Sequence, residues 1–321
     1  MVNSSYQREF DALSISVIKD FDQVATEYDE QDSGLDGHRF GKKFYRIDSS
    51  CFPKLLTGLR ENEDCGYITY ANGVIRDGMI PEKLSCLFKP LRFEAYSSEE
   101  SVAEELVVNE VLASQILNYF GCPTVYNTAT IRRNENGVAE YGLVSVDFST
   151  DDEEFKTLRE LKQTVPEWII NRNDWKKWQD NSGEYPQEYL DDFIYSFLVR
   201  HIILHDGDYN DNNLANLIDN ENGEKRLLNF DFEYAFDDIM FAGVSEFMKC
   251  LMTTLTELRK HNPGLYKRFI DNCTNLQRAI DNIPPSKLQP INEYHKEIVY
   301  DRLKMNLNLV QEAVRRIENV M

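Results

Sequence analysis

A short polar stretch carries the residues of this chain that are best suited to chemistry. Asp208 lies in this stretch, Asn213 follows five residues later, and Asp231 ends the next apolar run. Transfer of a phosphoryl group from a nucleotide needs a carboxylate that orients the attacking hydroxyl. It also needs an Asn and a second carboxylate that hold the metal ions bridging the phosphates. The spacing therefore points first to phosphoryl transfer, with Asp208 as catalytic base and Asn213 and Asp231 as metal ligands.

A helix and a hairpin are predicted to position these residues. Residues 188–204 carry apolar side chains near helical spacing, which predicts a buried helix before the polar stretch. Residues 214–218 and 226–230 read as two strands, joined by an Asn-Glu-Asn-Gly turn at 220–223. This hairpin would deliver Asp231 at the end of its return strand.

Upstream, the chain offers a lysine and a glutamate for a nucleotide. Residues 84–90 form a strand-like run that contains Lys89, and residues 101–121 form a helix with Glu110 in its middle. A lysine can grip the α- and β-phosphates of ATP when a helix carboxylate holds its side chain. A glutamate in mid-helix is usually only a solvated residue. Lys89 before it and the Asp–Asn–Asp set after it favour an ion pair between Lys89 and Glu110.

A second hairpin is predicted between this helix and the polar stretch. Residues 124–131 and 138–146 are strand-like and are joined by another Asn-Glu-Asn-Gly turn. The second run leads into Asp147 and Phe148, where a kinase crosses between its lobes. We therefore expect Asp147 and Phe148 to contribute to nucleotide binding, beside the lysine and its glutamate.

The order of these elements predicts the fold class. Lysine strand, glutamate helix, hairpin, hinge, helix, polar loop and metal strand follow one another as in an α+β, two-lobed, protein-kinase-like fold. Residues 1–148 would form a sheet-rich first lobe with an N-terminal extension, and residues 149–321 a helical second lobe. A length of 321 residues is sufficient for one such unit.

Several of these motifs resemble the HipA-like serine/threonine kinases. They are LFKP at 87–90, NEVLA at 109–113, NYFG at 118–121, ILHDGD at 203–208 and NLA at 213–215. The resemblance covers about residues 84–238 and extends more weakly along the helical tail, and it looks nearest to the compact, cell-translocating branch.

The resemblance implies a kinase that uses ATP with Mg²⁺ or Mn²⁺ to phosphorylate Ser or Thr of a protein substrate, with autophosphorylation. Lys89 would match the nucleotide lysine, Glu110 its partner and Asp208 the base. Asn213 and Asp231 would match the metal ligands. HipA-like kinases also have DNA-binding antitoxin partners, so a partner of that kind is a further expectation.

Departures from the family pattern leave other enzymes open. Tyr209 and Asn210 stand where the family shows a basic residue and a His, and Glu233 replaces a Gly. Residues 231–235 instead resemble choline kinases and aminoglycoside phosphotransferases, which favours a small-molecule kinase as the alternative. Those enzymes place a His two residues before the catalytic Asp, and here that residue is Asp206.

No clear phosphate-binding loop can be read from the sequence. Gly34, Gly37 and Gly41 are the densest glycine cluster, but they precede the lysine by about fifty residues. Gly73 and Gly78 lie nearer, in a stretch without a motif. A kinase needs backbone N–H groups over the phosphates, so a pseudokinase stays open as a further alternative.

Two other sites compete for the same polar residues. The first is a calcium loop that starts at Asp208 and uses Asn216 and Asp219, but its sixth position is not Gly and its twelfth is not Glu. The second is a metal phosphohydrolase site built on His201 and His205. A plain solvated loop in a scaffold protein is the remaining alternative.

Whole-chain properties exclude some classes of function. The formal net charge of −20 argues against direct contact with nucleic acid or an anionic membrane. Six scattered cysteines without a Cys-x-x-Cys pair favour reduced thiols. No apolar run is long enough for a membrane span, and the first residues lack the apolar core of a signal peptide. We therefore expect a cytoplasmic protein, or an effector secreted without a signal peptide.

Overall fold

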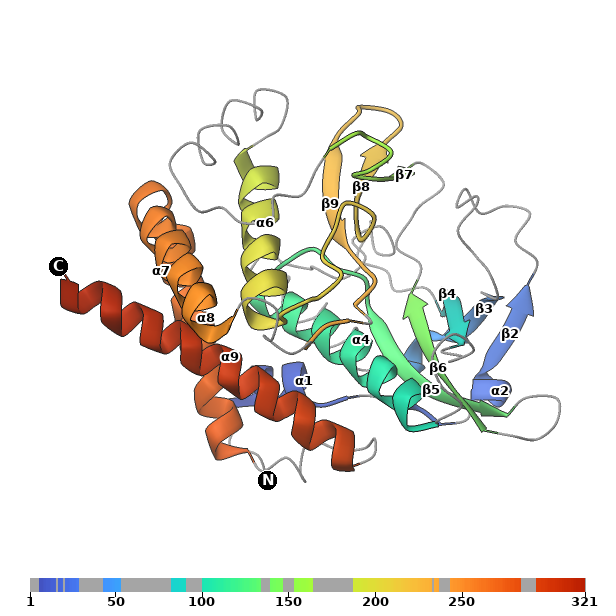
Figure 1. Ribbon diagram of the computed structural model, residues 1–321. Coiled ribbons are helices and arrows are strands. Elements are labelled where there is room, and N and C mark those ends of the chain that lie inside the picture. The colour runs from blue at the N-terminus through green and yellow to red at the C-terminus, as the bar shows by residue number, and fades with distance from the viewer. Residues whose placement is uncertain are drawn as a thin grey trace.

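The computed structural model of this chain describes most, but not all, of its residues. Those described are 6–15, 17–19, 21–28, 43–52, 82–90, 100–133, 139–146, 153–163, 187–232, 234–236, 243–283 and 293–320. Figure 1 shows strands gathered toward one end of the molecule and helices toward the other, with α4 (Glu100–Phe120) running between them. The predicted α+β arrangement, with a sheet-rich part and a helical part, is confirmed.

The described strands of the first lobe form one mixed sheet in the order β1-β5-β6-β4-β3-β2. Their bounds are β1 Val17–Ile18, β2 Ala25–Tyr28, β3 Lys43–Asp48, β4 Lys83–Pro90, β5 Asn127–Arg133 and β6 Ala139–Val146. Among the described strands of this sheet, β1 and β5 pair in parallel and the other pairs are antiparallel. Two short helices, α1 (Gln7–Leu13) and α2 (Phe21–Val24), and a 3-10 turn at Ser49–Cys51 complete the described part of this N-terminal region.

The helix α4 joins the sheet to the helical lobe. Along its length, side chains such as Val111, Leu112 and Ile116 are fully buried, which is why this helix forms part of the main core. Gly121 ends the helix with a φ of +80°, the left-handed conformation that a residue without Cβ adopts most easily. The helix predicted over 101–121 is therefore confirmed, and the side chains of its expected capping box lie outside the described residues.

The described part of the second lobe contains helices and a small antiparallel sheet. The helices are α6 (Gln187–Leu198), α7 (Gly243–His261), α8 (Pro263–Asn282) and α9 (Glu293–Val320). The sheet, in the order β7-β8-β9, contains Glu153–Thr157, Leu214–Asp219 and Lys225–Asn229. The predicted hairpin before Asp231 is thus β8–β9, and Gly223 in its turn has a φ of +72°.

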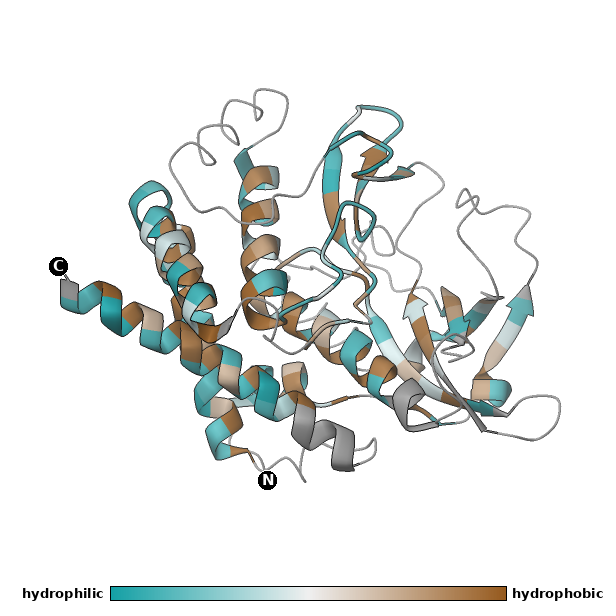
Figure 2. Ribbon diagram, viewed as in Figure 1, coloured by the Kyte–Doolittle hydropathy of each residue, from teal (hydrophilic) through white to brown (hydrophobic). Residues whose placement is uncertain are grey.

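The long C-terminal helices bury one face each. Leu303, Leu307, Val310 and Ile317 of α9 are buried along one stripe, as the spacing of apolar residues predicts. In Figure 2 the ribbons of α7 and α9 alternate between brown and teal, as expected for helices with a core face and a solvent face. Within the described part of the chain, no helix is both long enough and apolar enough to cross a membrane.

Two element boundaries differ from the sequence prediction by more than two residues. The strand expected from residue 124 begins at Asn127, because Thr124 pairs instead with Asn229 at the end of β9 in an isolated bridge. The helix expected over 188–204 is α-helical only to Leu198. Its last turn, Val199–Ile203 (η5), is a π-helix, a form often found at functional sites.

Replacement of the glycine that ends α4 tests the packing at this junction. A Cβ on Gly121 would lie 2.1 Å from Arg268 Nη2, whereas a Cβ on Gly223 would meet nothing within 4 Å. Both glycines have positive φ. We expect Gly223→Ala to lower the free energy of unfolding by about 1 kcal/mol and Gly121→Ala by about 2–3 kcal/mol, measured by urea unfolding. Equal losses would show that the Arg268 contact is easily relieved.

Candidate functional site

Lys89 lies where three elements distant in the sequence meet. Its Nζ lies 3.3 Å from Glu110 Oε1 on α4 and 2.9 Å from Asp231 Oδ1 just beyond β9. Pairing of β4 with β6 places Lys89 opposite Leu143 and so fixes the lysine in the sheet. The Glu110 side chain is 2% exposed, whereas those of Lys89 and Asp231 are 21% and 40% exposed. The cluster is therefore closed on the helix side and open to solvent on the other.

Glu110 holds more than the lysine. While Oε1 accepts a hydrogen bond from Lys89, Oε2 accepts one from Asn127 Nδ2 at 3.3 Å and one from the backbone N–H of Phe232 at 3.0 Å. Ser145 Oγ donates to Asn127 Oδ1 at 2.6 Å and fixes that amide. One carboxylate thus joins α4, the sheet and the segment that follows Asp231.

Asp208 is exposed, and two amide side chains hold it in place. Asn210 Nδ2 donates to the Asp208 carbonyl at 2.9 Å and to its Oδ1 at 2.7 Å. Asn213 Nδ2 donates to the same carbonyl at 2.8 Å and to Oδ2 at 3.0 Å. Because the nitrogen of the Asn213 amide is committed to Asp208, its oxygen is the atom left for a cation.

Asp231 adopts a backbone conformation that few residues with a side chain adopt. Its φ is +60°, and that of His205, at the other end of the site, is +45°. Such strain costs roughly 1–3 kcal/mol per residue and persists where surrounding contacts hold the backbone in place. At Asp231 those contacts are the Lys89 ion pair on the side chain and a hydrogen bond of 3.1 Å from Arg200 Nη2 to the carbonyl oxygen.

The structure thus brings together Lys89, Glu110 and Asp231 in one ionic cluster, and Asp208 with Asn213 in one loop. Asp147 and Phe148, predicted to contact the nucleotide, lie outside the described residues. The same holds for Glu233 and for every glycine considered for a phosphate-binding loop.

Three residues of the site were missed by the sequence analysis. Asn127 gives no local signal, since an Asn at the start of a strand is common. Arg200 and Asp206 form a fully buried ion pair, and the charged Arg200 within the apolar run 188–204 was the available signal. A charge in a buried helix is costly unless it is paired.

The calcium-loop alternative does not fit the observed geometry. Asn216, its ninth position, is fully buried within β8, and its Oδ1 accepts a hydrogen bond from Tyr189 at 2.5 Å. Over the part of the chain that the structure describes, no three or more His, Cys, Asp or Glu side chains group as metal ligands. His201 instead stacks on Phe197, with ring centroids 5.2 Å apart.

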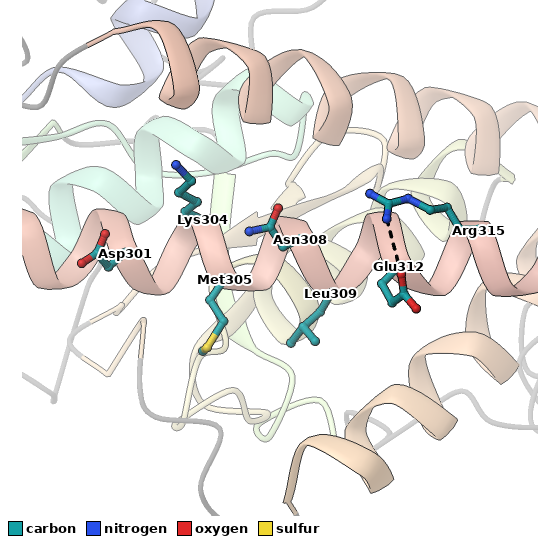
Figure 3. Close-up of a pocket in the computed structure, with 7 residues that line it drawn as sticks. All are labelled: Asp301, Lys304, Met305, Asn308, Leu309, Glu312 and Arg315. Atoms are coloured by element: carbon teal, nitrogen blue, oxygen red, sulfur yellow. Dashed lines mark ion pairs between the residues drawn. The ribbon is translucent and has the colours of Figure 1, made fainter.

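A pocket of about 600 Å³ lies elsewhere, along α9. Figure 3 shows the side chains that line it, which all belong to this one helix: Asp301, Lys304, Met305, Asn308, Leu309, Glu312 and Arg315. None of them is a candidate site residue. This pocket therefore adds nothing to the chemistry of the site.

Comparisons with known proteins give matches among solved structures alone. No family model and no curated protein matches the chain. The Helicobacter pylori proinflammatory kinase CtkA is 16% identical, with a TM-score of 0.45, over 72% of this chain and 91% of that one. The Golgi casein kinase is 12% identical, with a TM-score of 0.38; the match covers 88% of this chain and 71% of that one. The structure of the Golgi casein kinase with Mn/ADP bound is also 12% identical, with a TM-score of 0.36; the match covers 87% of this chain and 71% of that one. Likeness at these identities and TM-scores does not establish a function for this chain.

The pH dependence of stability tests the environment of His201. Burial, and to a lesser degree the charge of His205, lowers the pKa of His201 from 6.5 to about 4. As the pH falls below 6.5, the unfolded chain therefore binds this proton before the folded protein does, and stability is lost down to about pH 4. We expect the free energy of unfolding of His201→Gln to fall less than that of the parent between pH 7 and pH 5, by on the order of 1–2 kcal/mol. Parallel pH profiles, measured by urea unfolding, would contradict this prediction.

Proposed function

We propose that this chain is a HipA-like kinase that transfers the γ-phosphate of ATP to a Ser or Thr hydroxyl of a protein. The observation that carries the proposal is the position of Lys89, whose ammonium group lies between Glu110 and Asp231. A lysine held by a helix carboxylate, next to a second carboxylate after a strand, is the arrangement that protein kinases use for phosphoryl transfer from ATP.

Lys89 would bind the α- and β-phosphates, and Glu110 would keep its side chain extended toward them. Lys89 is partly exposed and Glu110 is buried, so a phosphate can approach the ammonium group but not its carboxylate partner. Removal of one member of such a pair leaves an uncompensated charge, which costs several kcal/mol when that charge is buried.

Asn213 and Asp231 fit a divalent cation by the chemistry of their donor atoms. Mg²⁺ and Mn²⁺ prefer carboxylate and carbonyl oxygens, and these residues offer one of each. A bound cation would bridge the phosphates of ATP and neutralise the charge that develops on them. The hydrogen bonds of Asn213 to Asp208 orient the amide oxygen before any cation is present.

Asp208 would act on the acceptor hydroxyl. It is exposed, and Asn210 and Asn213 fix its carboxylate in one orientation. Asp208 accepts the hydroxyl proton while the hydroxyl oxygen bonds to the γ-phosphorus and the bond from that phosphorus to ADP breaks. The exposure of Asp208 suits an acceptor that enters from solvent, as a protein side chain does.

Replacement of the two aspartates tests the proposed chemistry. With Mg²⁺ or Mn²⁺ and ATP labelled on the α- or γ-phosphate, we expect label transfer to protein from the γ-phosphate alone. Asp208→Asn and Asp231→Asn should each lower this transfer about 10²–10⁴-fold, and chelation of the metal should abolish it.

The matched control is Asp211→Asn in the same loop, because the Asp211 carboxylate pairs with the exposed Arg159, at 3.6 Å, and with no candidate site residue among those described. The Asp211→Asn variant should transfer label from the γ-phosphate as fast as the parent protein does. Label from the α-phosphate would mean nucleotidyl transfer, and nucleotide binding without transfer would mean a pseudokinase. Transfer to choline or an aminoglycoside instead of protein would favour the small-molecule alternative.

Replacement of the helix glutamate tests whether Lys89 needs a charged partner for catalysis. Glu110→Gln keeps the shape of the side chain but loses the charge that holds Lys89. We expect kcat/KM for ATP to fall about 10–100-fold. Glu105→Gln, which changes a carboxylate of the same helix 3.6 Å from Arg302, is the control and should keep its activity. Equal activities of the two variants would show that Lys89 does not need its partner.

A further inference from the structure

Arg200 is the largest charged side chain that is fully buried in the described residues. It lies in the π-helical turn η5 (Val199–Ile203), directly before the loop that carries Asp208. A guanidinium group has five N–H donors and cannot lose its charge in a protein. Burial of the guanidinium group is therefore favourable only where each of its N–H donors has a hydrogen-bond acceptor.

The surroundings of Arg200 supply five such contacts. Nε donates to Asp206 Oδ2 at 2.8 Å, and Nη2 donates to the same oxygen. Nη1 donates to the carbonyl oxygens of Asn213, at 2.8 Å, and Phe230, at 3.2 Å. Nη2 also donates to the carbonyl oxygen of Asp231 at 3.1 Å. Every acceptor of these hydrogen bonds belongs either to the Asp208 loop (206–213) or to residues 230–231 after β9.

Asp206 extends this contact to the proposed base. Its Oδ2 receives the guanidinium, and its Oδ1 accepts a hydrogen bond from the backbone N–H of Asp208 at 3.2 Å. Burial raises the pKa of Asp206, and the charge of Arg200 opposes that rise. Asp206 is thus a rigid link between the guanidinium and the backbone of Asp208.

Aromatic rings complete the enclosure of the guanidinium. Its carbon lies 5.0 Å from the ring centroid of Tyr209 and 4.7 Å from that of Phe232. Tyr209 belongs to the Asp208 loop and Phe232 follows Asp231. Both rings hold the cation by cation–π attraction, so the same two segments contact Arg200 through side chains as well as through carbonyl groups.

We propose that Arg200 and Asp206 are positioning residues. They hold Asp208, Asn213 and Asp231 in the relative positions that phosphoryl transfer needs, and this proposal rests on the proposed function. Folding alone does not require a charged pair, because a buried ion pair can often be replaced by apolar side chains without loss of stability. An apolar pair cannot hold three carbonyl groups and a backbone amide in a fixed arrangement. This difference separates a positioning role from a structural one.

The test uses the double variant Arg200→Met/Asp206→Leu in the full chain. Because Met and Leu fill similar space without leaving a lone charge, we expect the variant to fold, with a Tm lowered by the loss of partners for three carbonyl groups and one backbone amide. We expect kcat for γ-phosphate transfer to fall at least about 100-fold with a much smaller change in KM for ATP, as displacement of reacting groups does. The Mn²⁺ concentration for half-maximal rate should rise.

Hydrogen–deuterium exchange provides a readout that does not depend on catalysis. Amides of residues 206–213 and 230–232 should exchange faster in the double variant, while those of α4 and α8 should not change. The matched control is Arg268→Met, which removes another arginine stacked on a ring, 4.3 Å from the centroid of Tyr195, outside the site. It should lower Tm and leave kcat, Mn²⁺ dependence and exchange at 206–213 unchanged.

If the double variant does not fold, Asp206→Asn decides the question. It keeps an oxygen for Arg200 but weakens the link to Asp208, so kcat should fall about 10-fold with faster exchange at Asp208. A folded variant with unchanged kcat, Mn²⁺ dependence and exchange would overturn the proposal. Faster exchange in a chain whose parent transfers no phosphate would support the positioning role and refute the proposed function instead.

Discussion

The ionic contact of Lys89 with Glu110 and Asp231 is the constraint on which the rest of the site depends. These residues come from β4, from α4 and from the segment after β9, so the contact forms only when sheet, helix and hairpin are all in place. Glu110 adds hydrogen bonds to Asn127 and to the backbone of Phe232. The two lobes therefore meet at a buried carboxylate, and our proposal places the phosphates of ATP at the open side of the cluster.

A second polar centre, around Arg200, contacts the segments that carry Asp208, Asn213 and Asp231. It donates hydrogen bonds to the carbonyl groups of Asn213, Phe230 and Asp231, and so links the Asp208 loop to the end of the hairpin. The positive φ of Asp231 is compatible with this picture, since contacts from Lys89 and Arg200 hold its side chain and its carbonyl group. The strained backbone at Asp231 lowers the stability of the fold, and in our proposal it places the Asp231 carboxylate for metal binding.

Much of this arrangement could be predicted from the sequence because the signals were local. Periodic apolar residues predicted α4 and the α6 region, and Asn-Gly turns predicted the hairpins, so the order of Lys89, Glu110 and Asp231 could be read along the chain. Contacts made across the fold gave no such signal: the amide of Asn127 and the carbonyl partners of Arg200 are defined only in three dimensions. No phosphate-binding loop could be predicted, because the densest glycine cluster precedes Lys89 by about fifty residues and the nearer glycines follow no motif.

The most direct test of the central claim is a crystal structure of the protein with Mg²⁺ and a non-hydrolysable ATP analogue. The proposal predicts that Lys89 Nζ contacts the α- or β-phosphate while keeping its contact with Glu110. It also predicts that oxygens of Asn213 and Asp231 coordinate the metal and that Asp208 faces the γ-phosphate. A nucleotide bound away from Lys89, or a metal that contacts neither Asn213 nor Asp231, would contradict the proposal.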